Sequence, residues 1–480
     1  MLNTKLIKLL KTFSKADIIR FKDFVSSPYY NKNIKVIKLS EIVSENHPDF
    51  NSKNFTEELI FKEIFGKEVY NYFKIKNIVS DLYQLALEYL KVTATERNET
   101  SNDIHLLNEL HERKLDNIYK QKEKLINENL SAIMVKDEFY YLNQYQLARV
   151  NTSHYKFVKT GYTFDLIQNE FDLFLKYSLI GLLRHYAKLL TNKNHGNIQF
   201  KLEMFDDVWN YIKDKEFENE PSCRIYKEII ALELSKDEKD YKNLMESKDK
   251  YKDNLSDEDM YYILLVKVSF AVYRLKLGDE SYYKDRFSAL KEIQERNFTP
   301  DNNFLFVNFI STYVSACMVN EYDWANSFMK KYQNSISPGD EIANSINYCK
   351  GFLAYRLKEY DKAIEYFSKT NFKIFLMKIM IKSYTIRIYY EQDLYEQTFF
   401  AIDSFRHYLK SEKLIREDQK TANYEFLTFV NELTKLKLET SKKKINSDLM
   451  ILKKQIKEMS SNPLGAKNWL INKCENFKLK

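Results

Sequence analysis

Two short stretches of this chain repeat each other at a fixed distance. Glu321–Ala325 reads EYDWA and, 38 residues later, Glu359–Ala363 reads EYDKA. A repeat with a period of roughly 20–50 residues is typical of arrays in which each unit is one small supersecondary element packed on the next. Such arrays work through an extended surface. We therefore expect stacked units whose function depends on a surface more than on a catalytic pocket.

The composition restricts the fold class further. The 480-residue chain has only eight glycines and six prolines. A β-sandwich, a barrel or a doubly wound α/β protein of this length needs many more turn residues, so the scarcity predicts an all-α protein with short polar connections. The 36 Tyr and 33 Phe are expected to fill seams between helices rather than to stack on nucleobases.

The length exceeds what one compact core usually reaches, so we expect several domains or one extended array. Residues 1–97 are predicted to form a small N-terminal helical domain, and residues 98–220 a region of long helices and irregular helical hairpins. Residues 221–440 read as short helices in consecutive pairs, which predicts an array of antiparallel hairpins. Residues 441–480 are predicted to form basic C-terminal capping helices.

Local signals place individual helices within these regions. Ser14 and Asp17 form a variant of the capping box, which predicts a helix that begins there and ends near Ser26, before Pro28. The polar residues from 98 to 102 suggest a boundary, and one long, highly charged helix is predicted from 103 to about 129. The boundary and the long helix that follows it separate the predicted N-terminal domain from the rest of the chain.

One predicted helix pair carries a more specific pattern. Gly351 precedes Ala363 by twelve residues, Tyr360 stands just before the alanine and Phe367 follows it. This pattern resembles a tetratricopeptide (TPR) repeat. In that family small residues let the two helices of a hairpin approach closely, and large aromatics fill the seam to the next unit. The resemblance implies the first role for Gly351 and Ala363 and the second for Tyr360 and Phe367.

The resemblance covers about residues 257–410 and weakens away from this pair. Tyr313 stands at the glycine position of the preceding unit, and Thr398 at the small position of the following one. The spacings of 38 and 35 residues also depart from the family's period of roughly 34. The layout is similar to that of a group of uncharacterised bacterial proteins of about this length. The resemblance implies an α-solenoid of TPR-like antiparallel helix hairpins after the N-terminal helical domain, and no established activity.

Motifs for catalysis or cofactor binding are missing from the sequence. No glycines form a phosphate-binding loop, no serine lies in a nucleophile elbow, and no two cysteines form a C-x-x-C pair. His105 and His111 are six residues apart, whereas metal-binding helices place histidines at i and i+4. We expect no enzyme, no cofactor and no metal, although catalytic groups can also assemble from distant positions.

Three further features of the sequence predict where in the cell the protein is located. The four cysteines are too few and too scattered for a disulfide framework, which favours a reducing compartment. The N-terminus lacks the apolar core of a secretory signal. The uncharged stretch from Asn302 to Asn320 has an apolar run too short for a membrane span, so we expect a buried helix there. The sequence therefore predicts a cytoplasmic protein without a membrane span.

The TPR resemblance also implies a concave, peptide-binding groove. Its lining would include Tyr348, Phe352, Tyr355 and Arg356 from one unit and Arg387 and Tyr390 from the next. Aromatics flanked by arginines suit an extended or helical peptide with an acidic group. The alternative is that these aromatics only pack against a neighbouring helix. The resulting functional prediction is a non-catalytic scaffold that binds another protein or a peptide.

The C-terminal tail suggests a second kind of partner. Residues 435–480 contain 12 Lys against four acidic residues. Apolar residues from Ile445 to Met459 recur at spacings of four and three, which is a heptad seam. The lysines outside this seam are Lys442, Lys443, Lys444, Lys453, Lys454 and Lys457. They indicate either a nucleic-acid-associated or acidic-partner surface, or a solvated outer face of a capping helix. The sequence leaves the oligomeric state open.

Overall fold

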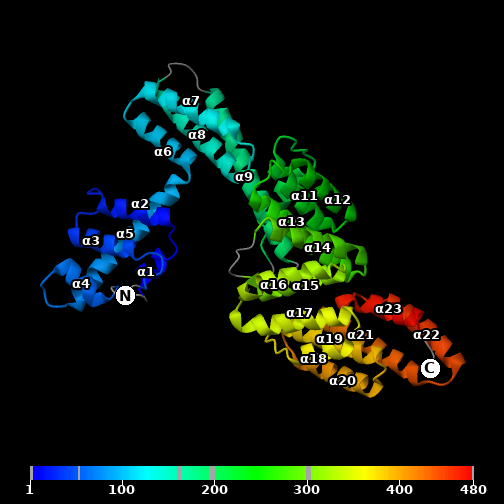
Figure 1. Ribbon diagram of the computed structural model, residues 1–480. Helices are drawn as coiled ribbons and strands as arrows, with labels where there is room; N and C mark the ends of the chain where they lie inside the picture. Colours follow the sequence, from blue (N-terminus) through cyan, green and yellow to red (C-terminus); the bar gives the residue numbers. More distant parts are fainter. Residues whose placement is uncertain (1–3, 52–54, 159–163, 194–199, 299–303, 478–480) are drawn as a thin grey trace. The chain divides into compact units, whose positions relative to one another are not determined.

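The structure is a computed structural model that describes residues 4–51, 55–158, 164–193, 200–298 and 304–477 (Figure 1). These residues are almost entirely helical, which confirms the predicted all-α class. The only strands in the described ranges are β1 (Phe304–Leu305) and β2 (Ile336–Ser337), a short parallel pair that the sequence did not predict. No helix in the described part is long and apolar enough to cross a membrane.

The chain divides into two compact units. One comprises residues 1–133 and 139–175, and the other comprises residues 134–138 and 176–480. The predicted boundaries after residues 97, 220 and 440 do not coincide with this division. Helix α9 (Phe164–Lys193) starts in the first unit and ends in the second.

The first unit contains two hydrophobic cores. Helices α1 to α5 enclose the core that runs from Leu6 to Tyr89, all of it within the predicted N-terminal domain. Helices α6, α7 and α8 enclose the other, which includes Leu107 and Tyr119. The bounds are α1 (Lys5–Leu10), α2 (Lys15–Ser26), α3 (Ile34–Glu45), α4 (Glu57–Phe65), α5 (Tyr72–Glu96), α6 (Glu99–Glu112), α7 (Asp116–Ala132) and α8 (Glu138–Val158).

The predicted capping box is present at the start of α2. The Ser14 hydroxyl accepts a hydrogen bond from the Asp17 amide at 3.1 Å, and the Asp17 carboxylate accepts one from the Ser14 amide at 3.0 Å. Two orphan amides are thereby satisfied, which fixes where the helix begins. The helix ends at Ser26, as predicted.

The single long helix predicted over residues 103–129 is wrong. The chain forms two helices instead: α6 starts at Glu99, inside the predicted boundary, and ends at Glu112, and α7 starts at Asp116. Lys114 adopts a left-handed conformation (φ 57°) between them. This turn lets the apolar faces of α6 and α7 pack on each other, and it contains neither glycine nor proline to reveal it in the sequence.

The second unit is built from consecutive helices that pack on their neighbours. Contacts join α11 to α12, α13 to α14, α15 to α16, α17 to α18 and α19 to α20, as the predicted pairs require. The bounds are α10 (Phe205–Ile212), α11 (Pro221–Ser235), α12 (Glu238–Tyr251), α13 (Asp257–Lys276), α14 (Tyr283–Glu295), α15 (Phe306–Met318), α16 (Tyr322–Tyr332), α17 (Ile342–Arg356), α18 (Tyr360–Ser368), α19 (Phe375–Glu391), α20 (Tyr395–Ser411), α21 (Glu417–Leu438), α22 (Lys442–Lys457) and α23 (Ala466–Glu475). Short 3-10 turns are η1 (Glu280–Tyr282), η2 (Gln333–Ser335), η3 (Gly339–Glu341) and η4 (Pro463–Gly465).

Gly351 lies where α17 approaches α18. A Cβ atom built at this glycine would be 2.8 Å from the ring of Phe367 and 3.2 Å from Cβ of Tyr366. The close approach is therefore to the aromatic residues of α18, and Ala363 is fully buried nearby in sequence on the same helix. A Cβ atom essentially never lies within 3.0 Å of another residue's atoms, so only glycine fits at this position without a shift of Phe367.

We predict that Gly351→Val lowers the melting temperature by about 2–5 °C, because overpacking at a buried seam costs about 1–3 kcal/mol. Thermal unfolding followed by circular dichroism measures the change. Gly339→Val is the matched control, since no atom lies within 4 Å of a Cβ built there. An equal melting temperature for both variants would contradict the packing at Gly351.

Candidate functional site: a chamber beneath the C-terminal segment

The chain's last helices return to a helix almost 190 residues earlier. We call residues 459–477 the C-terminal segment; it contains η4 and α23 (Figure 1). The Asn462 amide donates to the Lys276 carbonyl at 2.7 Å, and its side chain donates to the Leu275 carbonyl at 3.2 Å. Asn468 Nδ2 donates to the Gly278 carbonyl at 2.9 Å. These bonds join the C-terminal segment to the end of α13 and to the turn that follows it.

The C-terminal segment is also fastened to α19. Trp469 Nε1 donates to Glu391 Oε1 at 2.9 Å, and Lys473 Nζ lies 2.6 Å from the same carboxylate oxygen. Arg387 Nη1 donates to the Leu464 carbonyl at 3.0 Å. The segment therefore bridges α13 and α19, which belong to different helix pairs.

Two adjoining cavities lie beneath this segment. The larger, of about 440 Å³, is mainly apolar, and the smaller, of about 260 Å³, is mainly polar. Both are lined by Tyr283, Met318, Tyr384, Leu464 and Gly465, and we call the two cavities together the chamber. Gly465 has a φ of 70°, a conformation that glycine adopts without strain, and it places the chain over the chamber wall.

Three arginines line the chamber: Arg286 in the larger cavity, and Arg356 and Arg387 in the smaller. Among the described residues none of the three has a carboxylate within 4.0 Å, and the Nε atom of each has no hydrogen-bond partner. Their guanidinium groups donate to neutral groups: Ser311 at 2.8 Å for Arg286, Asn320 at 3.3 Å for Arg356, and Ser383 and the Leu464 carbonyl for Arg387.

The three cations are buried to different degrees, and Arg286 and Arg356 are partly exposed. Arg387 is only 3% exposed, and its guanidinium lies over the rings of Tyr384, Phe426 and Trp469. Burial lowers the pKa of the Arg286 guanidinium from its ordinary value. A buried cation without an acidic partner is costly, since desolvation is not compensated. The chamber therefore holds a concentration of uncompensated positive charge.

The predicted groove residues are only partly accessible. Tyr348 and Phe352 are fully buried in the core, and Tyr390 is 3% exposed and packs against Trp469. The expectation that these three rings line an open groove is therefore corrected: two of them pack against neighbouring helices, and the chain's own C-terminal segment covers the third. Tyr355 and Arg356 stay partly exposed.

Four of the six predicted groove residues nevertheless meet in one place. Phe352, Tyr355, Arg356 and Arg387 all line the smaller cavity. The sequence did not identify Arg286 or the C-terminal segment as parts of this site. The turn residues in Asn462-Pro463-Leu464-Gly465 were a signal that the chain reverses there. Nothing local indicates that the reversal meets α13.

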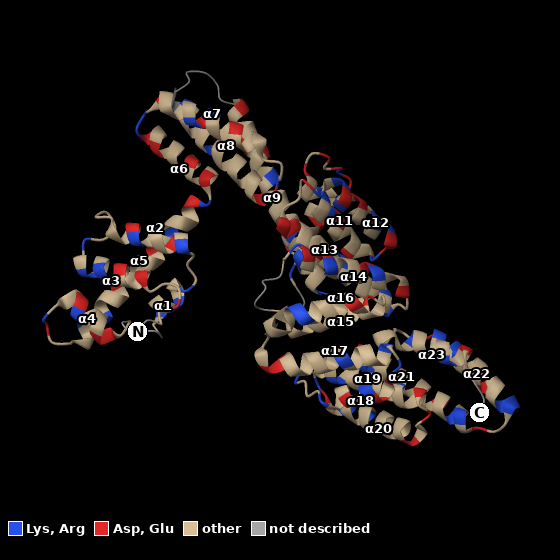
Figure 2. Ribbon diagram, viewed as in Figure 1, with Lys and Arg blue, Asp and Glu red and all other residues tan. Residues whose placement is uncertain are grey.

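The predicted basic surface lies on α22. Lys444 pairs with Glu439 and Lys453 with Glu475, the latter at 2.9 Å. The other four, Lys442, Lys443, Lys454 and Lys457, are exposed and form no ion pair within the described part of the chain. At helical spacing these four fall on one side of α22, opposite the buried Ile445, Leu452 and Ile456. Figure 2 shows lysines along this helix.

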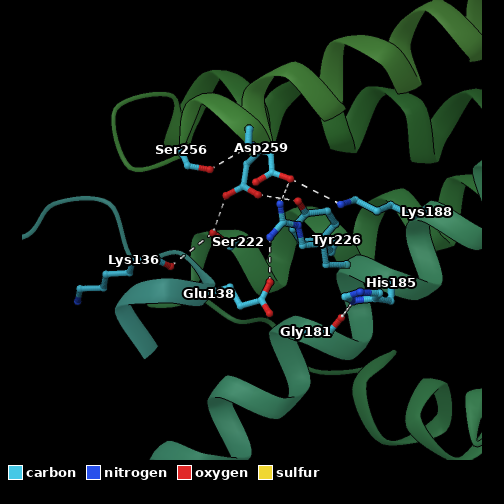
Figure 3. A network of polar contacts seen from close by, with 11 residues as sticks. Lys136, Glu138, Gly181, His185, Lys188, Ser222, Tyr226, Ser256 and Asp259 are labelled. Atoms are coloured by element: carbon cyan, nitrogen blue, oxygen red, sulfur yellow. Dashed lines mark hydrogen bonds and ion pairs between the residues drawn. The ribbon is translucent and has the colours of Figure 1, made fainter. Parts of the chain in front are cut away.

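A second polar cluster lies at the start of α13 (Figure 3). Asp259 is 4% exposed and accepts hydrogen bonds from the Tyr226 hydroxyl at 2.6 Å and the Ser222 hydroxyl at 3.1 Å. Burial, followed by the Asp259 charge, raises the pKa of Tyr226. The carboxylate lies in the first turn of a helix, where the helix dipole favours a negative charge.

The rest of this cluster is paired as well. Arg184 donates to Glu138 at 2.9 Å and also pairs with Glu258, which lies 3.6 Å from Lys188. His185 bonds the carbonyl of Gly181 in its own helix, and not the Ser222–Asp259 pair. The cluster thus ties the segment at residues 134–138 to α9, α11 and α13, and it does not have the geometry of a Ser-His-Asp triad.

The histidines and cysteines of the described ranges do not form a metal site. His111 faces His154, with their Nδ1 atoms 3.1 Å apart, while no group of three His, Cys, Asp or Glu that could hold a metal occurs in the described ranges. All four cysteines are free thiols and are buried. Burial raises the pKa of Cys317 to about 12 and that of Cys474 to about 11.

Comparison with known proteins gives no relative from which a role could be transferred. No protein-family model, no curated protein and no solved structure matches the chain.

We predict that Glu391→Ala speeds alkylation of Cys474 severalfold, because the loss of both bonds to the C-terminal segment lets α23 detach from its core. Mass spectrometry after a timed exposure to iodoacetamide measures the rate, with Cys349 as the internal reference. Glu396→Ala is the control, since Glu396 is exposed on α20 and forms no ion pair in the described part. Equal Cys474 rates in the two variants would contradict this role of Glu391.

Proposed function

We propose that this chain is a non-catalytic scaffold that binds another protein or a peptide through the concave face of a TPR-like helical array. The observation that supports it is the way in which the C-terminal segment is held. Asn462 bonds carbonyls at the end of α13 and Asn468 bonds the Gly278 carbonyl just beyond it, while Trp469 and Lys473 bond Glu391. Helices α13 and α19 thus already receive a polypeptide segment with an aromatic anchor, as peptide grooves do.

A partner with similar chemistry would compete with the chain's own segment. Its recognition elements would be an amide side chain for the α13 carbonyls and an aromatic residue followed by a cation for Glu391. Tyr355 and Arg356 are the groove residues that remain partly exposed, so they are the side chains that such a partner would reach first.

We predict that the double substitution Tyr355→Ala and Arg356→Ala reduces partner capture by about tenfold or more, because removal of an aromatic and arginine hot spot costs about 2 kcal/mol. The tagged full chain captures partners from its native host, and quantitative mass spectrometry compares the variants. A synthetic peptide of residues 459–477 should displace the captured partner, and the same peptide with Trp469→Ala should not.

The matched control for this experiment is Tyr29→Ala with Arg406→Ala. Tyr29 is 87% exposed in the first unit, and Arg406 is a partly exposed residue of α20 outside both cavities. Circular dichroism should show equal helicity for all variants. Unchanged capture by the groove variant would remove the groove from the proposal.

A second candidate is association with nucleic acid through α22. The observation in its favour is the side of α22 that carries Lys442, Lys443, Lys454 and Lys457 without acidic partners in the described part. Phosphate contacts of this kind depend strongly on salt, because each releases counterions. The capping role also remains: Leu452 and Ile456 belong to a hydrophobic core of the unit, and Ile445 is buried.

We predict that changing these four lysines to glutamate abolishes any retention on a duplex DNA or RNA column at low salt, since the neutralised phosphates supply the affinity. The control changes four exposed lysines of the first unit, Lys11, Lys15, Lys22 and Lys32, and produces the same net charge. Equal retention of both variants, or retention that does not fall with salt, would rule out the α22 surface.

A further inference from the structure

The larger cavity has the character of a small-molecule site. Its volume of about 440 Å³ is within the usual range for ligand pockets, roughly 300–1,000 Å³. Aliphatic and thioether side chains dominate its wall, including Val307, Ile310, Leu376, Met377 and Met380. Because Leu464 and Gly465 of the C-terminal segment form part of the same wall, the space suits a small apolar group better than a folded partner.

The border of this apolar space is cationic. Arg286 lines the larger cavity, and Arg356 and Arg387 line the smaller one that shares its wall. The carboxylate lining either cavity is Glu280, which is exposed and forms no ion pair in the described ranges. Lys276 is exposed at the rim, and Lys473 is neutralised by Glu391. The guanidiniums therefore have no anion supplied by the protein, although Arg387 is almost completely buried.

We infer that the chamber binds an amphiphile with one aliphatic chain and an anionic head. The chain occupies the apolar cavity, and the head accepts hydrogen bonds from Arg286 and from the arginines of the smaller cavity. Guanidinium groups match both carboxylate and phosphate oxygens in a forked geometry. Such a ligand supplies both things that the chamber lacks, an apolar filling and a counterion. The inference rests on the lining of the chamber, which shares Arg356 with the proposed peptide groove.

Calorimetric titration of the full chain tests the ligand class. The probes are decanoate, decyl phosphate, decanol and inorganic phosphate. We expect one equivalent of decanoate or decyl phosphate to bind, and decanol to bind at least tenfold more weakly, because charge-assisted bonds to the head are lost. Preference between the two anionic probes identifies the head. Equal binding of decanol and both anions, or no binding of either anion, would overturn the inference.

The substitution Arg286→Met tests whether this arginine binds the anionic head. Methionine keeps an apolar side chain of similar length, so we expect at least a tenfold loss of decanoate affinity and no change for decanol. The melting temperature without ligand should not fall, because the removed charge has no counterion. Arg406→Met is the control, and Met380→Trp, which fills the cavity, should weaken all alkyl probes. Unchanged decanoate binding in Arg286→Met, with decanol also unchanged, would contradict the site.

Discussion

Hydrogen bonds of Asn462 join the C-terminal segment to α13. Its amide groups satisfy the Leu275 and Lys276 carbonyls at the end of α13, and its Oδ1 accepts from the Lys467 amide at 2.8 Å, at the start of α23. One residue thus bonds the last carbonyls of α13 and the first amides of α23, two helix ends that are almost 190 residues apart in sequence. Asn462 is 4% exposed, so these bonds form in a low-dielectric environment where an unpaired amide is costly.

The position of Asn462 determines the chamber. With the turn fixed at α13, Leu464 reaches the Arg387 guanidinium, and α23 brings Trp469 and Lys473 to Glu391. The segment then covers cavities whose other walls come from helices of separate pairs. Peptide recognition and amphiphile binding would use neighbouring parts of this surface, and Arg356 belongs to both.

Local patterns were enough to predict most helices. Ser14 and Asp17 specify where α2 begins through bonds within one turn, and consecutive pairs such as α17 and α18 follow from apolar spacing with short connections. The break at Lys114 was missed because a non-glycine residue adopts the left-handed conformation there and apolar spacing continues on both sides.

The site was less predictable because it depends on contacts distant in sequence. A family register could bring Phe352, Tyr355, Arg356 and Arg387 together, and these four do line one cavity. It could not show that Tyr348 is buried, since burial depends on how Phe367 and Phe372 pack around it. No sequence motif includes Arg286, and it lines a chamber only because the C-terminal segment returns to α13.

The most direct test is hydrogen exchange of Asn462→Ala compared with the native sequence. If Asn462 fastens the C-terminal segment to α13, amides of residues 466–475 and those following the end of α13 should exchange faster together, while α2 and α3 in the first unit keep their native rates. Native exchange rates at both places in the variant would contradict the account, because the segment would then be held without the bonds on which the chamber depends.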